Sequence, residues 1–145
     1  MRKLMLLLVV FSTMLLSACS LLEGANKTVE YVDQATTHVN YVANFAEQAP
    51  QMIKAAATDP EIKQKLEDQL LALKQEVEQF NLIEAPKLAK DIHQQLVDKN
   101  QALLQEIDKV VQNGHVALDQ LQNSQLVTTI TDITSLLNRI QQLGL

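Results

Sequence analysis

Three histidines, His38, His93 and His115, are the side chains best suited to bind a metal or move a proton near neutral pH. None of them belongs to an H-E-x-x-H or E-x-x-H pattern, which places two ligands on one helix face. His115 and Asp119 are four residues apart, but a metal site needs two further ligands and none is indicated. The sequence therefore predicts no metal and no cofactor, and surface or half-buried imidazoles instead.

The hydroxyl and carboxyl groups are not arranged for catalysis either. Ser124 and Ser135 lie outside any G-x-S-x-G turn, and no glycine-rich phosphate loop is present. Acid–base catalysis needs two carboxylates that converge on one bond, whereas neighbours such as Glu67 and Asp68 point in different directions on a helix. These patterns predict that the chain is not an enzyme.

Cys19 is the only cysteine, and it follows a short apolar run. Arg2 and Lys3 precede that run, and small residues follow it, which is the plan of an export signal. The run covers residues 4–16, about 13 residues, and a membrane-spanning helix needs about 20. An ordinary cleaved signal is the other alternative, but it would leave an unpaired thiol in an oxidising compartment.

The segment Leu16-Ser17-Ala18-Cys19 resembles the lipobox of bacterial lipoproteins. This resemblance implies that the Cys19 sulfur receives a diacylglyceryl group and that a signal peptidase cuts between Ala18 and Cys19. Two acyl chains hold a protein on a membrane far better than one. Residues 1–18 are then a signal peptide, and the mature protein is anchored through lipid at the extracytoplasmic face of the cell membrane.

The mature part would have 127 residues, enough for one modest domain. The signal carries two basic residues, so 10 Lys and Arg remain against 17 Asp and Glu, a formal net charge of −7. Nucleic-acid binding needs clustered Lys and Arg, so the acidic body argues against it. It also argues against a protein that lies flat on anionic lipid.

Apolar residues recur at steps of three and four, which predicts helices and no strand. After an acylated cysteine and tether at 19–26, we expect helices over about 27–48, 60–80, 86–112 and 124–143, all in one domain at 27–145. The expected inward positions of these helices are, in chain order, Val32, Thr36, Val39, Ala43 and Ala46 with Val29, Val42 and Phe45 beside them; Ile62, Leu66, Leu70, Leu73, Val77 and Phe80; Leu88, Ile92, Leu96, Leu103, Ile107 and Val110; and Leu126, Ile130, Ile133, Leu137 and Ile140.

Turn residues set the limits of these helices. Pro50 either kinks the first helix or separates it from a short segment that ends near Ala57. Asp59 precedes Pro60 and is expected to cap the second helix. Asn113-Gly114 is expected to end the third helix with a left-handed glycine. A short helical turn around Leu118 and Leu121 and a cap at Asn123-Ser124 are expected to follow.

Long helices joined by short links fold back on one another. The sequence therefore predicts an all-α protein, an antiparallel bundle of about four main helices that follows the cleaved signal peptide. Steps of three and four favour packing at crossing angles near 20°. A long coiled coil that dimerises is the alternative.

One stretch, residues 80–93, is dense in both apolar and titratable side chains. It could form a recognition edge for a partner from Glu84, Asp91 and His93. The alternative is a plain helix-to-helix corner, in which Leu82 and Ile83 close the end of the bundle and His93 faces outward.

Several segments resemble a family of small lipoproteins from Gram-positive bacilli. They are Cys-Ser-Leu-Leu-Glu at 19–23, Thr-Val-Glu-Tyr-Val-Asp-Gln-Ala-Thr at 28–36, Thr-Asp-Pro-Glu at 58–61 and Asp-Ile-His-Gln-Gln-Leu-Val-Asp at 91–98. The resemblance implies the anchor, the helical body and the compartment. It supplies no activity and no site residues.

Two functions remain open. The first is a helical protein-interaction module, held outside the membrane by its lipid, that binds another envelope protein or a second copy of itself. The second is a binding protein for a small apolar or amphiphilic molecule held between helices, because the alanines of the first helix, such as Ala35 and Ala49, could leave room for a ligand.

Overall fold

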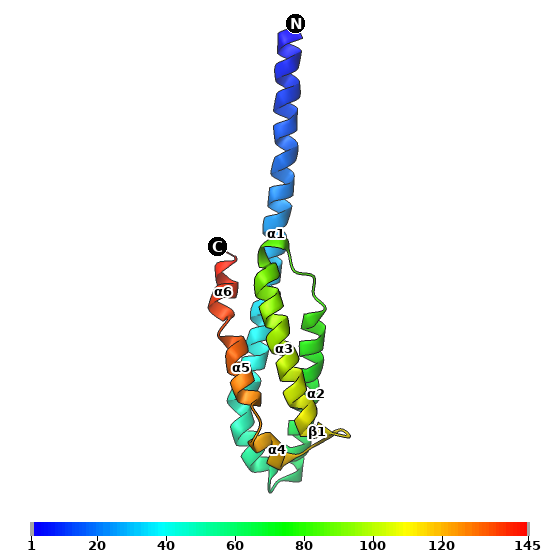
Figure 1. Ribbon diagram of the computed structural model, residues 1–145, viewed down its shortest axis with the longest axis vertical. Helices are drawn as coiled ribbons and strands as arrows, with labels where there is room; N and C mark the ends of the chain where they lie inside the picture. The colour runs from blue at the N-terminus through cyan, green and yellow to red at the C-terminus, as the bar shows by residue number, and fades with distance from the viewer. Residues whose placement is uncertain (1, 145) are drawn as a thin grey trace.

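Four helical columns run alternately up and down around one core in the computed structural model (Figure 1). The structure describes the backbone of residues 2–144 and the side chains of residues 24–144. The elements are α1 (Arg2–Ala56), α2 (Pro60–Asn81), the 3-10 helix η1 (Lys87–Ala89), α3 (Lys90–Val110), β1 (Val111–Gln112), β2 (His115–Val116), α4 (Leu118–Gln122), α5 (Leu126–Thr134) and α6 (Leu137–Gln142). The prediction of an all-α antiparallel bundle is confirmed.

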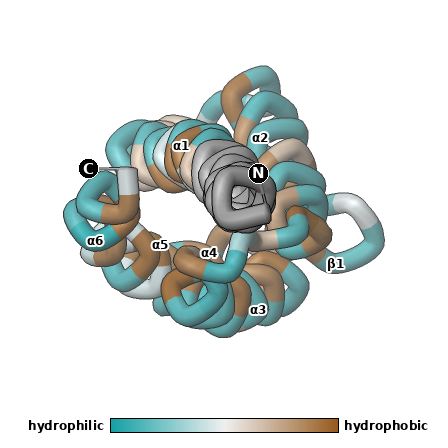
Figure 2. Tube along the Cα trace, turned by 90° about the horizontal axis from the view of Figure 1, so that it is seen from above, coloured by the Kyte–Doolittle hydropathy of each residue, from teal (hydrophilic) through white to brown (hydrophobic). Residues whose placement is uncertain are grey.

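Figure 2 looks along the bundle and shows α1, α2, α3 and the column of α4, α5 and α6 around a common axis. The expected inward positions of α2 are buried from Leu66 to Phe80. The predicted positions of the last column are also buried or packed against the core. These parts of the periodic pattern are confirmed, because each column must bury its apolar side against the other three.

The buried face of α1 agrees with the prediction at Val39, Val42 and Phe45 and differs from it at other positions. Its buried side chains are Thr28, Tyr31, Ala35, His38, Val39, Val42, Phe45, Ala49 and Ala56. Val29, which was expected beside the core, is 56% exposed, and Thr36 is only half-buried. The prediction was wrong here because Tyr31 and His38 turn inward to polar partners on other helices, so the buried face includes polar residues.

Pro50 lies inside α1, which continues without interruption to Ala56. The alternative of a separate segment after Pro50 is therefore wrong. The proline is exposed, while Ala49 and Ala56 are buried and Ile53 packs against the core. Burial of this last stretch offsets the hydrogen bond that proline cannot donate. The helix also includes residues 24–26, which were expected to form part of the tether.

The cap of α2 is confirmed. Asp59 Oδ1 accepts hydrogen bonds from the backbone N–H groups of Glu61, at 2.9 Å, and Ile62, at 3.3 Å. At the other end of α2 the chain forms a connector, residues 82–89, before α3. Ile83 packs against the core, but Leu82 is 85% exposed, so the expectation that both residues close the bundle is wrong for Leu82.

A small hairpin of two strands, each two residues long, follows α3, where no strand was expected. Val111 pairs with Val116 and Gln112 with His115, in antiparallel register. The turn residues Asn113 and Gly114 have φ of 53° and 80°. Two successive residues with positive φ make the tight turn that Asn-Gly favours between strands. The third helix thus ends at Val110, and the glycine serves the hairpin rather than a helix cap.

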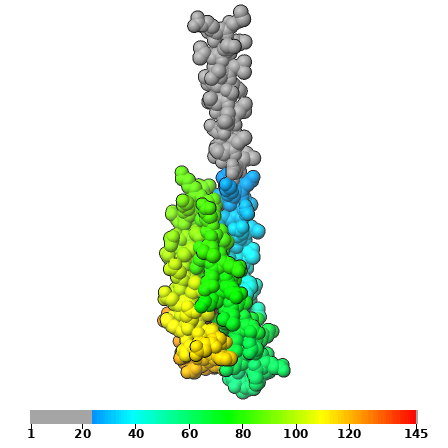
Figure 3. Space-filling model, turned by 90° about the vertical axis from the view of Figure 1, so that its right-hand side faces the viewer, coloured from blue at the N-terminus to red at the C-terminus, as the bar shows by residue number. Residues whose placement is uncertain are grey.

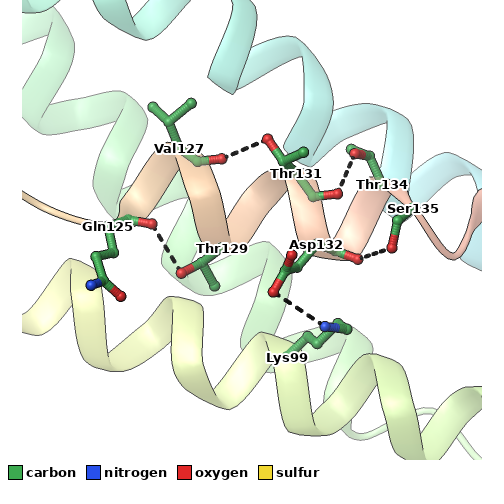
Figure 4. A network of polar contacts seen from close by, with 8 residues as sticks. All are labelled: Lys99, Gln125, Val127, Thr129, Thr131, Asp132, Thr134 and Ser135. Atoms are coloured by element: carbon green, nitrogen blue, oxygen red, sulfur yellow. Dashed lines mark hydrogen bonds and ion pairs between the residues drawn. The ribbon is translucent and has the colours of Figure 1, made fainter.

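The last predicted helix is divided into α5 and α6, with Ser135 and Leu136 between them. Figure 4 shows the hydroxyl groups of α5 and of the residue after it that bond to backbone carbonyls. The hydroxyls of Thr129, Thr131, Thr134 and Ser135 donate to carbonyls three or four residues earlier, at 2.6–3.0 Å. Such hydroxyls compete with the helical N–H donors and bend helices. The break makes Leu136 buried and leaves Leu137 only half-buried.

Candidate functional site

The three residues of the predicted recognition edge, Glu84, Asp91 and His93, differ in their exposure to solvent. Glu84, in the connector, and Asp91, in the first turn of α3, are both exposed. His93 is half-buried, and its ring contacts Tyr31 and Phe80 at centroid distances of 5.6 and 5.5 Å. The expectation of an outward-facing His93 in a plain corner is therefore wrong. A role of these residues in partner binding stays a prediction.

His93 belongs to a buried network that the sequence pattern did not reveal. We call it the polar seam and define it as Tyr31, His38, Phe80, His93 and Asn100. The Tyr31 hydroxyl lies 3.2 Å from His93 Nδ1, and the His38 ring stacks on Phe80 at 4.0 Å with an interplanar angle of 10°. The seam joins α1, α2 and α3 across the core.

Asn100, on α3, is completely buried and contacts side chains of α1 and α2. Its Oδ1 lies 3.2 Å from His38 Nε2, and its amide donates to Asn81 Oδ1 at 2.8 Å. Glu76 Oε1 lies 3.4 Å from the other ring nitrogen of His38. A neutral imidazole donates from one nitrogen only, so Asn100 and Glu76 compete for its proton. The sequence offered one indication of this contact: Asn100 lies at the helical spacing of the inward-facing Leu96 and Leu103, where an apolar residue would be expected.

The protonation of the seam follows from its burial. Burial lowers the pKa of His38, an effect only partly opposed by its hydrogen bonds to Asn100 and Glu76 and by the Glu76 charge. Burial likewise lowers the pKa of His93 and raises that of the Tyr31 hydroxyl above its usual range. All three groups are therefore neutral near pH 7. With 1% of its surface exposed, His38 offers no face to a substrate and acts in packing.

A second buried titratable group supports the hairpin. Glu67 is 4% exposed, and its Oε1 accepts from the Val116 N–H at 2.9 Å and lies 3.5 Å from His115 Nδ1. His115 is therefore a neighbour of Glu67, and it lies on β2 rather than on a helix with Asp119. This contact holds the hairpin on α2.

Two of the grooves on the surface of the described residues bear on partner binding. The first, about 730 Å³, lies at the end of the bundle where the described part of α1 begins. It runs between α1 and the connector, and its lining includes Lys27, Tyr31, Ile83, Glu84 and Lys90. The second, about 340 Å³, lies at the opposite end. We call them the anchor-end groove and the distal groove.

The distal groove lies between the last turns of α1 and the start of α5, with α4 below. Its lining is mainly apolar and consists of Pro50, Ile53, Leu121, Gln122, Ser124, Leu126 and Val127. Val127 is 41% exposed, so an apolar side chain remains open to solvent at its rim.

Metal and membrane features are limited among the residues whose side chains are described. In this part of the chain, His, Cys, Asp and Glu form no group of three that could hold a metal ion. Along the same residues, no helix combines the length and apolar character that crossing a bilayer requires. The predicted lipidation and cleavage residues, Cys19 and Ala18, lie outside the described side chains.

Comparison with known proteins places the chain among bacterial lipoproteins. A model described as "Family of unknown function (DUF6376)" matches residues 31–143. The chain is 34% identical over 135 residues to "Uncharacterized lipoprotein YybP" of Bacillus subtilis (strain 168), covering 90% of this chain and 91% of the relative. No solved structure matches. The expected likeness to lipoproteins of bacilli is confirmed, and the chain belongs to the family of unknown function DUF6376.

Proposed function

We propose that this lipoprotein is a helical protein-interaction module without catalytic activity, held by its lipid at the extracytoplasmic face of the membrane. Its task is to present a binding surface to another protein of the cell envelope. The observation that carries the proposal is the distal groove, a surface recess whose lining is mainly apolar.

The distal groove suits a protein partner by position and by lining. It includes Pro50 and Ile53 of α1. Pro50 follows Gly24 by 26 helical steps, which rise about 39 Å. An anchored bundle that stands upright would hold the groove well clear of the lipid headgroups. Its apolar floor, with Gln122 and Ser124 at the edge, resembles the grooves that receive one face of an amphipathic helix.

The alternative of a small ligand held between helices has less support. Four alanines of the first helix were expected to leave room. Ala35 and Ala49 are 0% and 1% exposed within the core, and Ala43 and Ala46 are half-buried. Small residues at such positions bring helix backbones close together, which fills the space from both sides. The buried side-chain nitrogen and oxygen atoms of the described residues all have hydrogen-bond partners within the chain.

Site-specific photo-crosslinking in intact cells tests the proposal. A photoreactive residue at Val127 is compared with one at Leu71, which is equally exposed, at 40%, but lies on α2 outside the distal groove. We expect a protein adduct of defined mass from position 127 only, and its loss when Ile53→Asp is added. Adducts with lipid alone, or identical protein adducts at both positions, would contradict the proposal.

A Cys19→Ser variant separates the roles of anchor and groove. It is expected to release the protein from the membrane and to reduce the adduct at position 127, because the partner is met at the membrane. If the released protein forms the same adduct in the same amount, the anchor has no part in partner binding.

A further inference from the structure

The most exposed large apolar side chains of the described residues gather at one end of the bundle. Leu82 is 85% exposed, Leu88 72% and Val29 56%, whereas the next most exposed, Tyr41, reaches 42%. Leu82 and Leu88 lie in the connector, and Val29 lies near the first residues of α1 whose side chains are described. Figure 3 shows the connector, in green, reaching the same end of the molecule as the start of the described surface, in blue.

Local contacts fix the connector beside α1 at this end. The anchor-end groove is lined from one side by Lys27, Glu30 and Tyr31 and from the other by residues 83–87 and Lys90. The Tyr31–His93 contact, at 3.2 Å, ties α1 to the first turns of α3 just beyond the connector. The exposed leucines are therefore held in place by the fold.

This end of the bundle is also the one nearest to the lipid. Cys19 precedes Gly24 by five residues, so whatever its conformation the intervening chain spans at most about 18 Å. The acyl chains of the anchor enter the bilayer at Cys19. Leu82, Leu88 and Val29 thus lie at the end of the bundle from which the anchor extends.

Charge at this end differs from charge on the rest of the chain. Lys27, Lys87 and Lys90 line the anchor-end groove with Glu30 and Glu84, and the exposed Asp91 lies next to Lys90, so that the formal charges of these six residues cancel. The whole chain carries −5. Among the described residues, neither Lys87 nor Lys90 forms an ion pair, whereas Lys74 and Lys99 pair with aspartates on other helices. Anionic headgroups attract lysines that lie within a Debye length of the surface.

We propose that the anchor end is a membrane-seating surface, in which Leu82 and Leu88 enter the headgroup layer of an anionic bilayer while Lys87 and Lys90 contact its phosphates. Leucines beside lysines suit this interface, since apolar side chains enter the acyl boundary and lysines remain among the headgroups. The bundle then stands upright on the membrane, and its acidic sides stay away from the lipid. This inference uses a different surface from the distal groove and does not depend on a protein partner.

The test uses the full acylated protein in vesicles of phosphatidylglycerol and phosphatidylcholine. Acylation blocks the sulfur of Cys19, the only native cysteine, so an introduced cysteine can be labelled alone. An environment-sensitive fluorophore is attached to Leu88→Cys, Leu82→Cys or, as the control at the opposite end, Val127→Cys. All three positions are exposed, and unchanged helicity by circular dichroism confirms that each variant folds.

We expect brominated lipid to quench the fluorophore at positions 82 and 88 several-fold more strongly than at position 127. Quenching at 88 should fall when phosphatidylcholine replaces phosphatidylglycerol and in a Lys87→Glu/Lys90→Glu variant. Equal quenching at 88 and 127 would overturn the proposal, because the bundle then either stands off the membrane or lies on its side. If neither the change of lipid nor the Lys87→Glu/Lys90→Glu variant alters quenching at position 88, the proposed contact with anionic headgroups is wrong.

Discussion

Replacing Asn100 by alanine is expected to destabilise the bundle by about 2–4 kcal/mol. The change removes the contact with His38 Nε2, at 3.2 Å, and the hydrogen bond to Asn81, at 2.8 Å. The hydrogen bond to Asn81 contributes about 1 kcal/mol. His38 Nε2, buried and left without a partner even when the ring proton moves to Nδ1 beside Glu76, costs a further 1–3 kcal/mol or so. His38 is 1% exposed, so water cannot replace the lost partner.

The assay is urea unfolding followed by far-ultraviolet circular dichroism, with Asn44→Ala as the control. Asn44 is exposed, and its replacement should change the free energy of unfolding by less than about 0.5 kcal/mol. A second background, His38→Phe, keeps a ring stacked on Phe80 but has no nitrogen to satisfy. There, Asn100→Ala should cost only about 1 kcal/mol.

The difference between the two backgrounds measures the coupling between Asn100 and His38. If Asn100→Ala costs the same with histidine and with phenylalanine at position 38, the two side chains do not depend on each other. The account of the polar seam would then be wrong, and the cost would reflect packing volume alone.

Three further predictions concern stability. Burial lowers the pKa of His38 below its ordinary 6.5, so the unfolded chain binds protons first on acidification. The free energy of unfolding should therefore fall as the pH drops below about 6.5, less steeply in His38→Phe, in urea unfolding at a series of pH values. Pro50→Ala should stabilise the protein by about 1–3 kcal/mol in thermal unfolding, because an exposed interior proline lacks a helical N–H donor; a lower melting temperature would refute this. Gly114→Ala should destabilise by about 1–2 kcal/mol, because φ there is 80°, whereas Gly24→Ala, in a helix with open space around it, should stabilise by about 0.5–1 kcal/mol; equal effects of the two changes in calorimetry would contradict the assignment of the turn.

Local sequence patterns were sufficient for much of the fold. The stripe from Leu66 to Phe80 and the Asp59 cap follow from interactions within one helix or one turn, so spacing alone could predict them. The lipoprotein class followed in the same way from a short local motif ending at Cys19, and the comparisons confirm it.

The missed features depend on distant partners or on competition between local structures. His38 is buried because Asn100, 62 residues away, lies opposite it, and no local pattern contains that information. Asn-Gly can end a helix or turn a hairpin, and Glu67 on α2 favours the hairpin by accepting from Val116. The exposure of Leu82 and Leu88 depends on how the connector crosses the end of the bundle, which spacing cannot predict.

The contact between Tyr31 and His93 gives the protein an intrinsic spectroscopic probe. The chain has no tryptophan, so its near-ultraviolet spectrum comes mainly from Tyr31 and Tyr41. Tyr41 is 42% exposed on the side of α1, whereas Tyr31 is 2% exposed and bonded to His93. A buried, immobile ring gives near-ultraviolet dichroism that is lost when specific packing is lost. The tyrosine band should therefore monitor, without any label, whether α1 and α3 remain joined at the end of the bundle where the described side chains of α1 begin.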